Sequence, residues 1–223
     1  YMITNKISRV EIAVLVLMFI MLVAGFVLVF ISVPLFEWYT VEDGLVEWLT
    51  VAGLLLGAFT CFIRIVRLRT NKSWLFLFVT LMLGLVLFFG AGEEISWGQR
   101  IFGIQSPEYF KEHNTQGETN IHNLILDGVR LNRWIFSILL SIVLGIYVIV
   151  IPLLYRSKKW MQRIVDYWGI PLPKIFQTIA LLVMAFLTQL IPHGKRAELL
   201  ECGIALMLFL IIRFPANETT FKR

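Results

Sequence analysis

The sequence predicts an all-α fold: a polytopic membrane bundle of six transmembrane helices with a long extracytoplasmic capping loop. Hydrophobic residues make up 58% of the chain and charged residues only 16%, whereas charged residues are about 25% of a typical soluble domain. The mean hydropathy of +0.80 agrees with this comparison. Six apolar runs alternate with polar segments, and runs of about 20 residues are long enough to cross a bilayer as helices. We therefore expect residues 1–223 to form a single transmembrane domain.

The six predicted spans differ in charge. Four of them contain no Asp, Glu, Lys or Arg: residues 12–33, 74–92, 134–155 and 175–192. Of the other two, residues 44–63 carry Glu47, and residues 197–212 carry Glu198 and Glu201 near their start. The first run has no small-residue cleavage motif, which favours an uncleaved membrane anchor over a signal peptide.

The distribution of lysine and arginine predicts the orientation of the bundle. When the spans are threaded back and forth, fourteen of the 20 Lys and Arg residues fall on the side of the N-terminus and six on the other side. Cytoplasmic loops carry the excess of positive charge, so both termini are expected to be cytoplasmic. The net charge of +5 is then explained by topology, and no nucleic-acid partner is expected.

A cytoplasmic amphipathic segment is predicted at residues 158–168. Helical spacing places Trp160, Ile164 and Trp168 on one face, with the basic residues mostly away from it. A helix of this kind lies in the interface of a membrane, with its apolar face toward the lipid. We therefore expect this connector to lie on the inner leaflet.

The outer loop, residues 93–133, is too long for a plain connection between helices. Loops of this length in compact domains are usually functional or disordered, and the aromatic and aliphatic content of this loop argues against disorder. Ser106 and Pro107 are typical of a helix start, so a short helix is expected through about His113. Polar residues alternate over 114–122, which is compatible with an extended segment that aims one side of the chain at a common target.

Residues capable of chemistry concentrate at the predicted outer face. Twelve of the 15 carboxylates and all three histidines fall there. Ionisable groups at membrane depth are costly to bury, and their usual explanation is function. Glu198 and Glu201 share a helix face at i, i+3 spacing. The predicted catalytic residues are Glu93, Glu94, His122, Arg100, Gln99 and Asn120.

Three interpretations of this cluster stay open. In the first, carboxylates and imidazoles from several helices bind a divalent metal. The spacings match no diagnostic metal motif. The tentative ligands are Glu47, Glu94, His122, His193 and Glu201. In the second, crowded carboxylates beside a histidine act as general acid or base without a metal, and Arg100 and Gln99 hold an anionic or carbonyl oxygen. In the third, the charges pair with one another, for example Glu94 with Arg100, and serve only the structure.

Two motifs carry a resemblance to a known group of proteins. The runs Gly-Glu-Glu-Ile-Ser-Trp-Gly-Gln-Arg at residues 92–100 and Glu-Thr-Asn-Ile-His-Asn at residues 118–123 resemble a bacterial family of small multi-pass membrane proteins. The resemblance covers roughly a fifth of the chain and comes with no assigned activity. It implies the cytoplasmic (inner) membrane of a bacterium as the location.

The expected function is that of an enzyme with a carboxylate and histidine site at the extracytoplasmic face. Its reaction would be a hydrolysis or a transfer, with or without a divalent metal, and its substrate a lipid or lipid-linked molecule of the outer leaflet. One alternative is a non-catalytic accessory subunit of a larger membrane complex. An ion- or proton-coupled carrier ranks third, because no charge lies near the midpoint of any predicted span.

Overall fold

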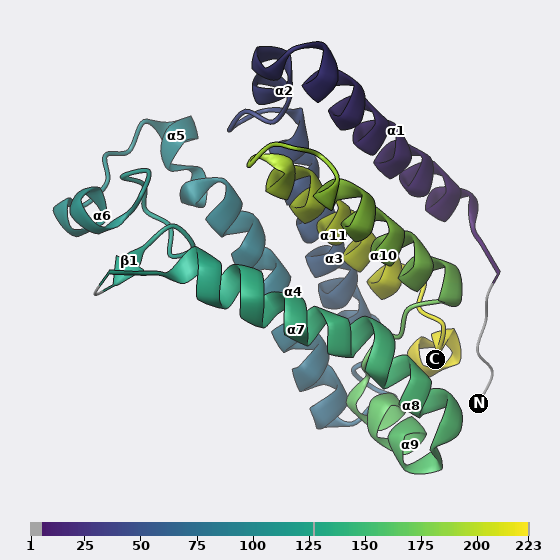
Figure 1. Cartoon of the computed structure of the whole chain (residues 1–223). Coiled ribbons are helices and arrows are strands. Elements are labelled where there is room, and N and C mark those ends of the chain that lie inside the picture. The colour runs from purple at the N-terminus through teal and green to yellow at the C-terminus, as the bar shows by residue number, and fades with distance from the viewer. Residues whose placement is uncertain (1–5, 127, 223) are drawn as a thin grey trace.

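A computed structural model describes residues 6–126 and 128–222. It is 75% helical and all-α in class (Figure 1). Within the described residues, four helical segments are long and apolar enough to cross a membrane, which is compatible with a membrane protein. They are α1 (Arg9–Ile31), α3 (Leu45–Leu68), α4 (Trp74–Glu94) and the segment Ser137–Ser157.

The last two predicted spans are helices of a different character. Helix α10 (Ile175–Gln189) is apolar but has only 15 residues. Helix α11 (Arg196–Arg213) carries Glu198 and Glu201 as well as its two terminal arginines. The helices themselves are confirmed by the structure, and their crossing of a membrane remains a prediction.

The segment around Ser137–Ser157 is a long rod, which we call the α7 rod. It consists of four consecutive helical pieces: η2 (Asn132–Leu139), α7 (Leu140–Gly145), η3 (Ile146–Val150) and α8 (Ile151–Ser157). The pieces η2 and η3 are π-helical. The shorter elements are α2 (Val33–Tyr39), η1 (Ser96–Gly98), α5 (Gln99–Phe102), α6 (Glu108–His113), α9 (Lys159–Trp168) and η4 (Glu218–Phe221). Strands β1 (Ile125–Leu126) and β2 (Val129–Arg130) form an antiparallel hairpin in which Ile125 pairs with Arg130.

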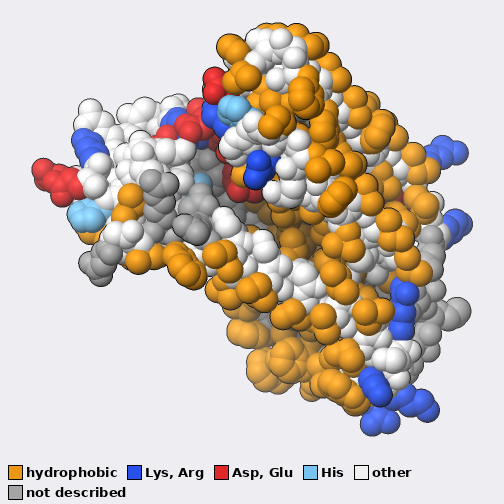
Figure 2. Space-filling view, viewed as in Figure 1, with side chains coloured by type: hydrophobic (Ala, Val, Ile, Leu, Met, Phe, Trp, Pro, Cys, Tyr) orange, Lys and Arg blue, Asp and Glu red, His pale blue; other side chains and the backbone are white. Residues whose placement is uncertain are grey.

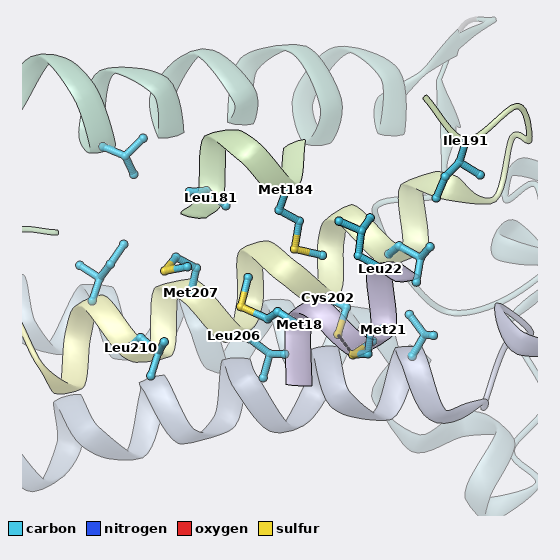
Figure 3. Packing of buried hydrophobic residues seen from close by; sticks show 14 of the residues in the cluster. Met18, Met21, Leu22, Leu181, Met184, Ile191, Cys202, Leu206, Met207 and Leu210 are labelled. Carbon is cyan, nitrogen blue, oxygen red and sulfur yellow. Dashed lines mark hydrogen bonds between the residues drawn. The ribbon is translucent and has the colours of Figure 1, made fainter. Parts of the chain in front are cut away.

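Helix α11 is the centre of the bundle and packs against α3, α10 and α1. Met18, Met21, Cys202 and Met207 belong to its main hydrophobic cluster, and Figure 3 shows their side chains meeting between these helices. Unbranched methionines fill the irregular gaps between helices well. The position of α11 in this cluster places its acidic first turns beside α3 rather than apart from the bundle.

Glycine decides how closely α3 approaches α11. A Cβ atom at Gly53 would lie 2.9 Å from the carbonyl carbon of Ala205, a distance that real Cβ atoms essentially never show. Small residues allow such backbone contacts between membrane helices. Gly145 of α7 has open space around its Cβ position instead, so no neighbour within the described residues crowds that glycine.

The end of the bundle that holds the termini is fixed by a buried ion pair. Lys174 Nζ lies 2.9 Å from Glu11 Oε1, and both side chains are almost completely buried. Glu11 also closes a capping box with Ser8 at the start of α1. The pair therefore ties the first turn of α1 to the start of α10.

The two helices predicted outside the six spans, at residues 158–168 and after Ser106, are both present. Residues 158–168 correspond to α9, in which Val165 is buried while Trp160, Ile164 and Trp168 are exposed. Helix α6 begins at Glu108, two residues after Ser106. On the face shown in Figure 2, acidic and histidine side chains gather at the end with α5 and α6, and basic side chains gather at the opposite end.

The extended conformation expected for residues 114–122 is wrong, because this stretch is a series of turns. Asn114 Oδ1 accepts hydrogen bonds from the backbone N–H groups of Gln116 (2.8 Å) and Glu118 (3.3 Å). Asparagine side chains form turns in this way. Gly117 then takes a positive φ of 69° that turns the chain back.

Candidate functional site

A strained turn ends α4 and starts the capping loop, which we define as residues 95–131. Ser96, Trp97 and Gly98 have φ values of 45°, 55° and 77°, and left-handed backbone is costly for the two residues that are not glycine. The turn folds the Trp97 ring over Gly92, where an added Cβ would lie 2.8 Å from the ring. These contacts explain the positions of both glycines in the motif at residues 92–98.

Hydrogen bonds of Ser96 compensate for this strain. Its side chain is fully buried and donates a short hydrogen bond to the Glu118 carboxylate. It also accepts a hydrogen bond from Asn120 Nδ2 at 2.9 Å. A buried hydroxyl that both donates and accepts a hydrogen bond holds its two partners in fixed positions. Ser96 therefore holds the second motif of the loop against the first.

Glu93 anchors the loop from the last turn of α4. Its Oε1 accepts from Trp97 Nε1 at 2.9 Å. Its Oε2 accepts from the backbone N–H groups of Ile121 (2.6 Å) and His122 (3.0 Å). Glu93 is 3% exposed. Three hydrogen bonds to one buried carboxylate leave little capacity for a substrate, so its evident role in this structure is to hold the loop.

Arg100 joins three segments of the chain. Its guanidinium lies 2.6 Å from Glu47 in α3, 2.7 Å from Glu118 in the loop and 2.9 Å from Asp43 before α3. The contact with Asp43 is an ion pair without hydrogen-bond alignment, since Arg100 Nε has no hydrogen-bond partner among the described residues. Burial lowers the pKa of Arg100, but the hydrogen bonds to Glu118 and the charge of Glu47 outweigh it and hold the pKa above its usual value.

Gln99 and Asn120 also bind the loop. Gln99 Nε2 donates to Ser106 Oγ at 2.6 Å, and Gln99 Oε1 accepts from the backbone N–H of Thr119 at 2.7 Å. Asn120 Oδ1 accepts from Asn114 Nδ2 at 2.8 Å and from the backbone N–H of Asn123 at 3.2 Å. Four of the six predicted catalytic residues are thus engaged in positioning the loop: Glu93, Arg100, Gln99 and Asn120.

A second group of side chains lies next to these anchors and is not engaged in the same way. Glu94 is close enough to His122, Glu198 and Glu47 to interact with them electrostatically, and Glu201 interacts in the same way with Glu94 and Glu198. Within the described part of the chain, no hydrogen bond or ion pair engages the carboxylates of Glu94, Glu198 and Glu201. We call these three the open carboxylates.

The open carboxylates can be reached from outside the protein. Glu201 is exposed and Glu94 and Glu198 are half-buried, although α11 is enclosed by α3, α10 and α1. The molecule is hollowed between the α7 rod and α10, and acidic side chains lie at the end of this hollow near the capping loop (Figure 2). Helices α3, α4 and α11, which correspond to the second, third and sixth apolar runs, thus bring Glu47, Glu94, Glu198 and Glu201 to one end of the bundle.

The two histidines of the prediction lie in different places. His122 Nδ1 is 3.9 Å from Glu93 Oε2, and the ring contacts Asn123 through Nε2 at 3.1 Å. His193 Nε2 is 3.3 Å from Glu37, and its ring packs edge-on against Phe36. His122 thus lies beside Glu93 and Asn123 of the loop network, near enough to Glu94 to interact with it electrostatically. His193 belongs to the contact between α2 and the turn before α11.

The tentative metal set has no support in this geometry. Among residues 6–126 and 128–222, no three His, Cys, Asp or Glu side chains are arranged to hold a metal ion. One proposed ligand, Glu47, is the partner of Arg100 at 2.6 Å, and another, His193, faces Glu37. A metal centre would need several ligands within about 2.0–2.6 Å of one point.

Sequence reasoning left two important residues out of the site. Glu118 is the centre of the loop network, and its signal was its place in the second motif, beside the predicted Asn120. Ser96 is fully buried and bound to Glu118. Its position between the Glu pair and Trp97 was the available signal.

Comparisons of the chain with models of protein families, with curated proteins and with solved structures find no match.

Proposed function

We propose that the chain is a membrane-embedded enzyme that uses its open carboxylates and His122 for acid–base chemistry on a lipid or lipid-linked substrate. The observation that carries the proposal is the difference between two sets of acidic groups at the same end of the bundle. Glu93, Glu47 and Glu118 are each engaged by hydrogen bonds or by Arg100. The open carboxylates are engaged by neither within the described residues.

The proposed topology places six helices across the cytoplasmic membrane of a bacterium, with both termini in the cytoplasm. The capping loop then lies on the extracytoplasmic side. The separation of basic and acidic side chains between the two ends of the bundle supports this orientation (Figure 2), because positive charge accumulates on the cytoplasmic side. A substrate would enter from the outer leaflet through the hollow between the α7 rod and α10.

The charges of the site favour one kind of substrate. Three carboxylates of the same sign repel a phosphate, and the guanidinium of Arg100 is already shared among Asp43, Glu47 and Glu118. A reacting group that is neutral or carries an amine suits this environment better. In the proposed mechanism a carboxylate among Glu94, Glu198 and Glu201 removes a proton from water or a hydroxyl, and His122 exchanges protons with the same site.

The test is a search for lipid conversion by the purified protein. Proteoliposomes made from a total bacterial lipid extract are incubated with the protein, and lipid mass spectrometry follows each lipid class over time. We expect the protein to deplete one class and the variants Glu94→Gln and His122→Ala to be slower by about a hundredfold or more. The matched control is Glu108→Gln, since Glu108 is an exposed carboxylate of α6, and it is expected to keep full activity.

Two results would overturn the proposal. The first is equal conversion by the Glu94→Gln variant and the unmodified protein, when thermal unfolding shows both to be folded. The second is the absence of any conversion together with a stoichiometric protein partner that remains bound after mild detergent extraction. That result would instead support the accessory-subunit alternative.

A further inference from the structure

A narrow cleft lies between α8 and α10, away from the acidic site. Its volume is about 170 Å³. Apolar side chains form most of its walls, including Val148, Pro152, Ile175 and Ile179, and Arg156 lies on its lining as well. The acidic site thus lies at one end of the molecule, and the apolar cleft with Arg156 lies toward the other end.

Hydrogen bonds between the two walls hold the cleft in place. Pro152 has no N–H to donate to the carbonyl of Val148 one turn earlier, and Thr178 Oγ1 of α10 donates to that carbonyl at 3.2 Å instead. Tyr147 adds a second connection, because its hydroxyl donates to the carbonyl of Pro171 at 2.5 Å. These two hydrogen bonds hold α10 and the segment before it beside the α7 rod.

The chemistry of the lining identifies the class of ligand. The apolar walls suit hydrocarbon, since burying methylene groups there removes them from water. Among the described residues, Arg156 has neither an ion pair nor a hydrogen bond, so its guanidinium is free to bind an anion. A guanidinium binds a phosphate with paired, charge-assisted hydrogen bonds. Basic pockets between membrane helices bind the headgroups of anionic lipids for this reason.

We propose that this cleft binds one anionic phospholipid, independently of the acidic site. Part of an acyl chain lies against Val148, Pro152 and Ile179, and the phosphate contacts Arg156. The site is a lipid site in the leaflet at the end of the bundle that holds the termini. Because the lipid bridges α8 and α10, its binding stabilises their contact.

The test measures lipid-dependent stability of the full chain in detergent. Thermal unfolding is followed by tryptophan fluorescence during titration with phosphatidylglycerol, with phosphatidylcholine as the neutral lipid and inorganic phosphate as the free anion. We expect phosphatidylglycerol to raise the unfolding temperature and the Arg156→Gln variant to need about tenfold more of this lipid for the same effect. The control Arg69→Gln removes an exposed cation near the end of α3 and should behave like the unmodified protein.

A second variant tests the apolar part of the cleft without changing charge. Ile179→Trp replaces an aliphatic side chain of the lining by a bulkier indole ring. It should weaken the effect of phosphatidylglycerol while Arg156 is intact. The proposal is overturned if Arg156→Gln and Arg69→Gln respond alike, if phosphatidylcholine stabilises as well as phosphatidylglycerol, or if inorganic phosphate reproduces the whole effect. None of these results bears on the proposed enzyme, because none of the variants changes the open carboxylates.

Discussion

Replacement of Arg100 by glutamine is expected to destabilise the capping loop more than any other single change at that end of the bundle. The substitution leaves Glu47, which is 6% exposed, and the largely buried Glu118 without their cation. Removal of one partner from a buried ion pair costs about 3–5 kcal/mol. The half-exposed Asp43 adds less than about 1 kcal/mol, because water screens its charge. The total corresponds to a fall in unfolding temperature of about 6–20 °C for a chain of this size.

The assay is thermal unfolding of the protein in detergent, followed by tryptophan fluorescence. The control variant Arg69→Gln removes an exposed arginine and should shift the midpoint by no more than about 2 °C. The double variant Arg100→Gln with Glu118→Gln should recover part of the loss, because the second change removes an unpaired charge. A shift for Arg100→Gln as small as that of Arg69→Gln would refute the assignment of Arg100 as the centre of the loop network.

Three further predictions concern packing, the buried ion pair and the strained turn. Gly53→Ala should lower the free energy of unfolding by about 1–3 kcal/mol, because its Cβ meets the backbone of Ala205. Gly145→Ala should leave that free energy unchanged or raise it, and thermal unfolding compares the two variants. Lys174→Met should cost about 3–5 kcal/mol because it leaves the buried Glu11 unpaired, and Glu11→Gln in the same chain should restore part of that loss. Ser96→Ala should cost about 1–3 kcal/mol by removing the hydrogen bond to Glu118, and faster hydrogen exchange of residues 118–123 is the measurement; unchanged exchange would contradict it.

The helical elements could be predicted from the sequence because their signals are local. Uncharged apolar runs mark α1, α4 and α10 within a few residues of their observed ends. The proline after Ser106 also predicted a helix that begins close by, at Glu108. Composition and length carry this information without any knowledge of tertiary contacts.

The internal arrangement of the capping loop could not be predicted, because it depends on contacts between distant residues. The pairing of Ser96 with Glu118 joins two motifs that are separated by 22 positions. Alternating polar residues from Asn114 onward were compatible with an extended strand, but Asn114 bends the chain by accepting hydrogen bonds from its own neighbours. The sequence predicted that acidic residues gather at one end, and they do so on the face shown in Figure 2. It could not separate the carboxylates that hold the loop from the open carboxylates.

Chemical labelling can separate the open carboxylates from those that hold the loop. A hydrophobic carbodiimide reacts with accessible protonated carboxyl groups in apolar surroundings, and the positions of its adducts identify the reactive residues. The protein in membranes is treated with dicyclohexylcarbodiimide, digested and mapped by mass spectrometry. The account predicts adducts at the open carboxylates Glu94, Glu198 and Glu201, and little reaction at Glu93 and Glu118, whose oxygens are engaged in hydrogen bonds. Equal labelling of the two sets, or labelling of Glu93 and Glu118 alone, would contradict it.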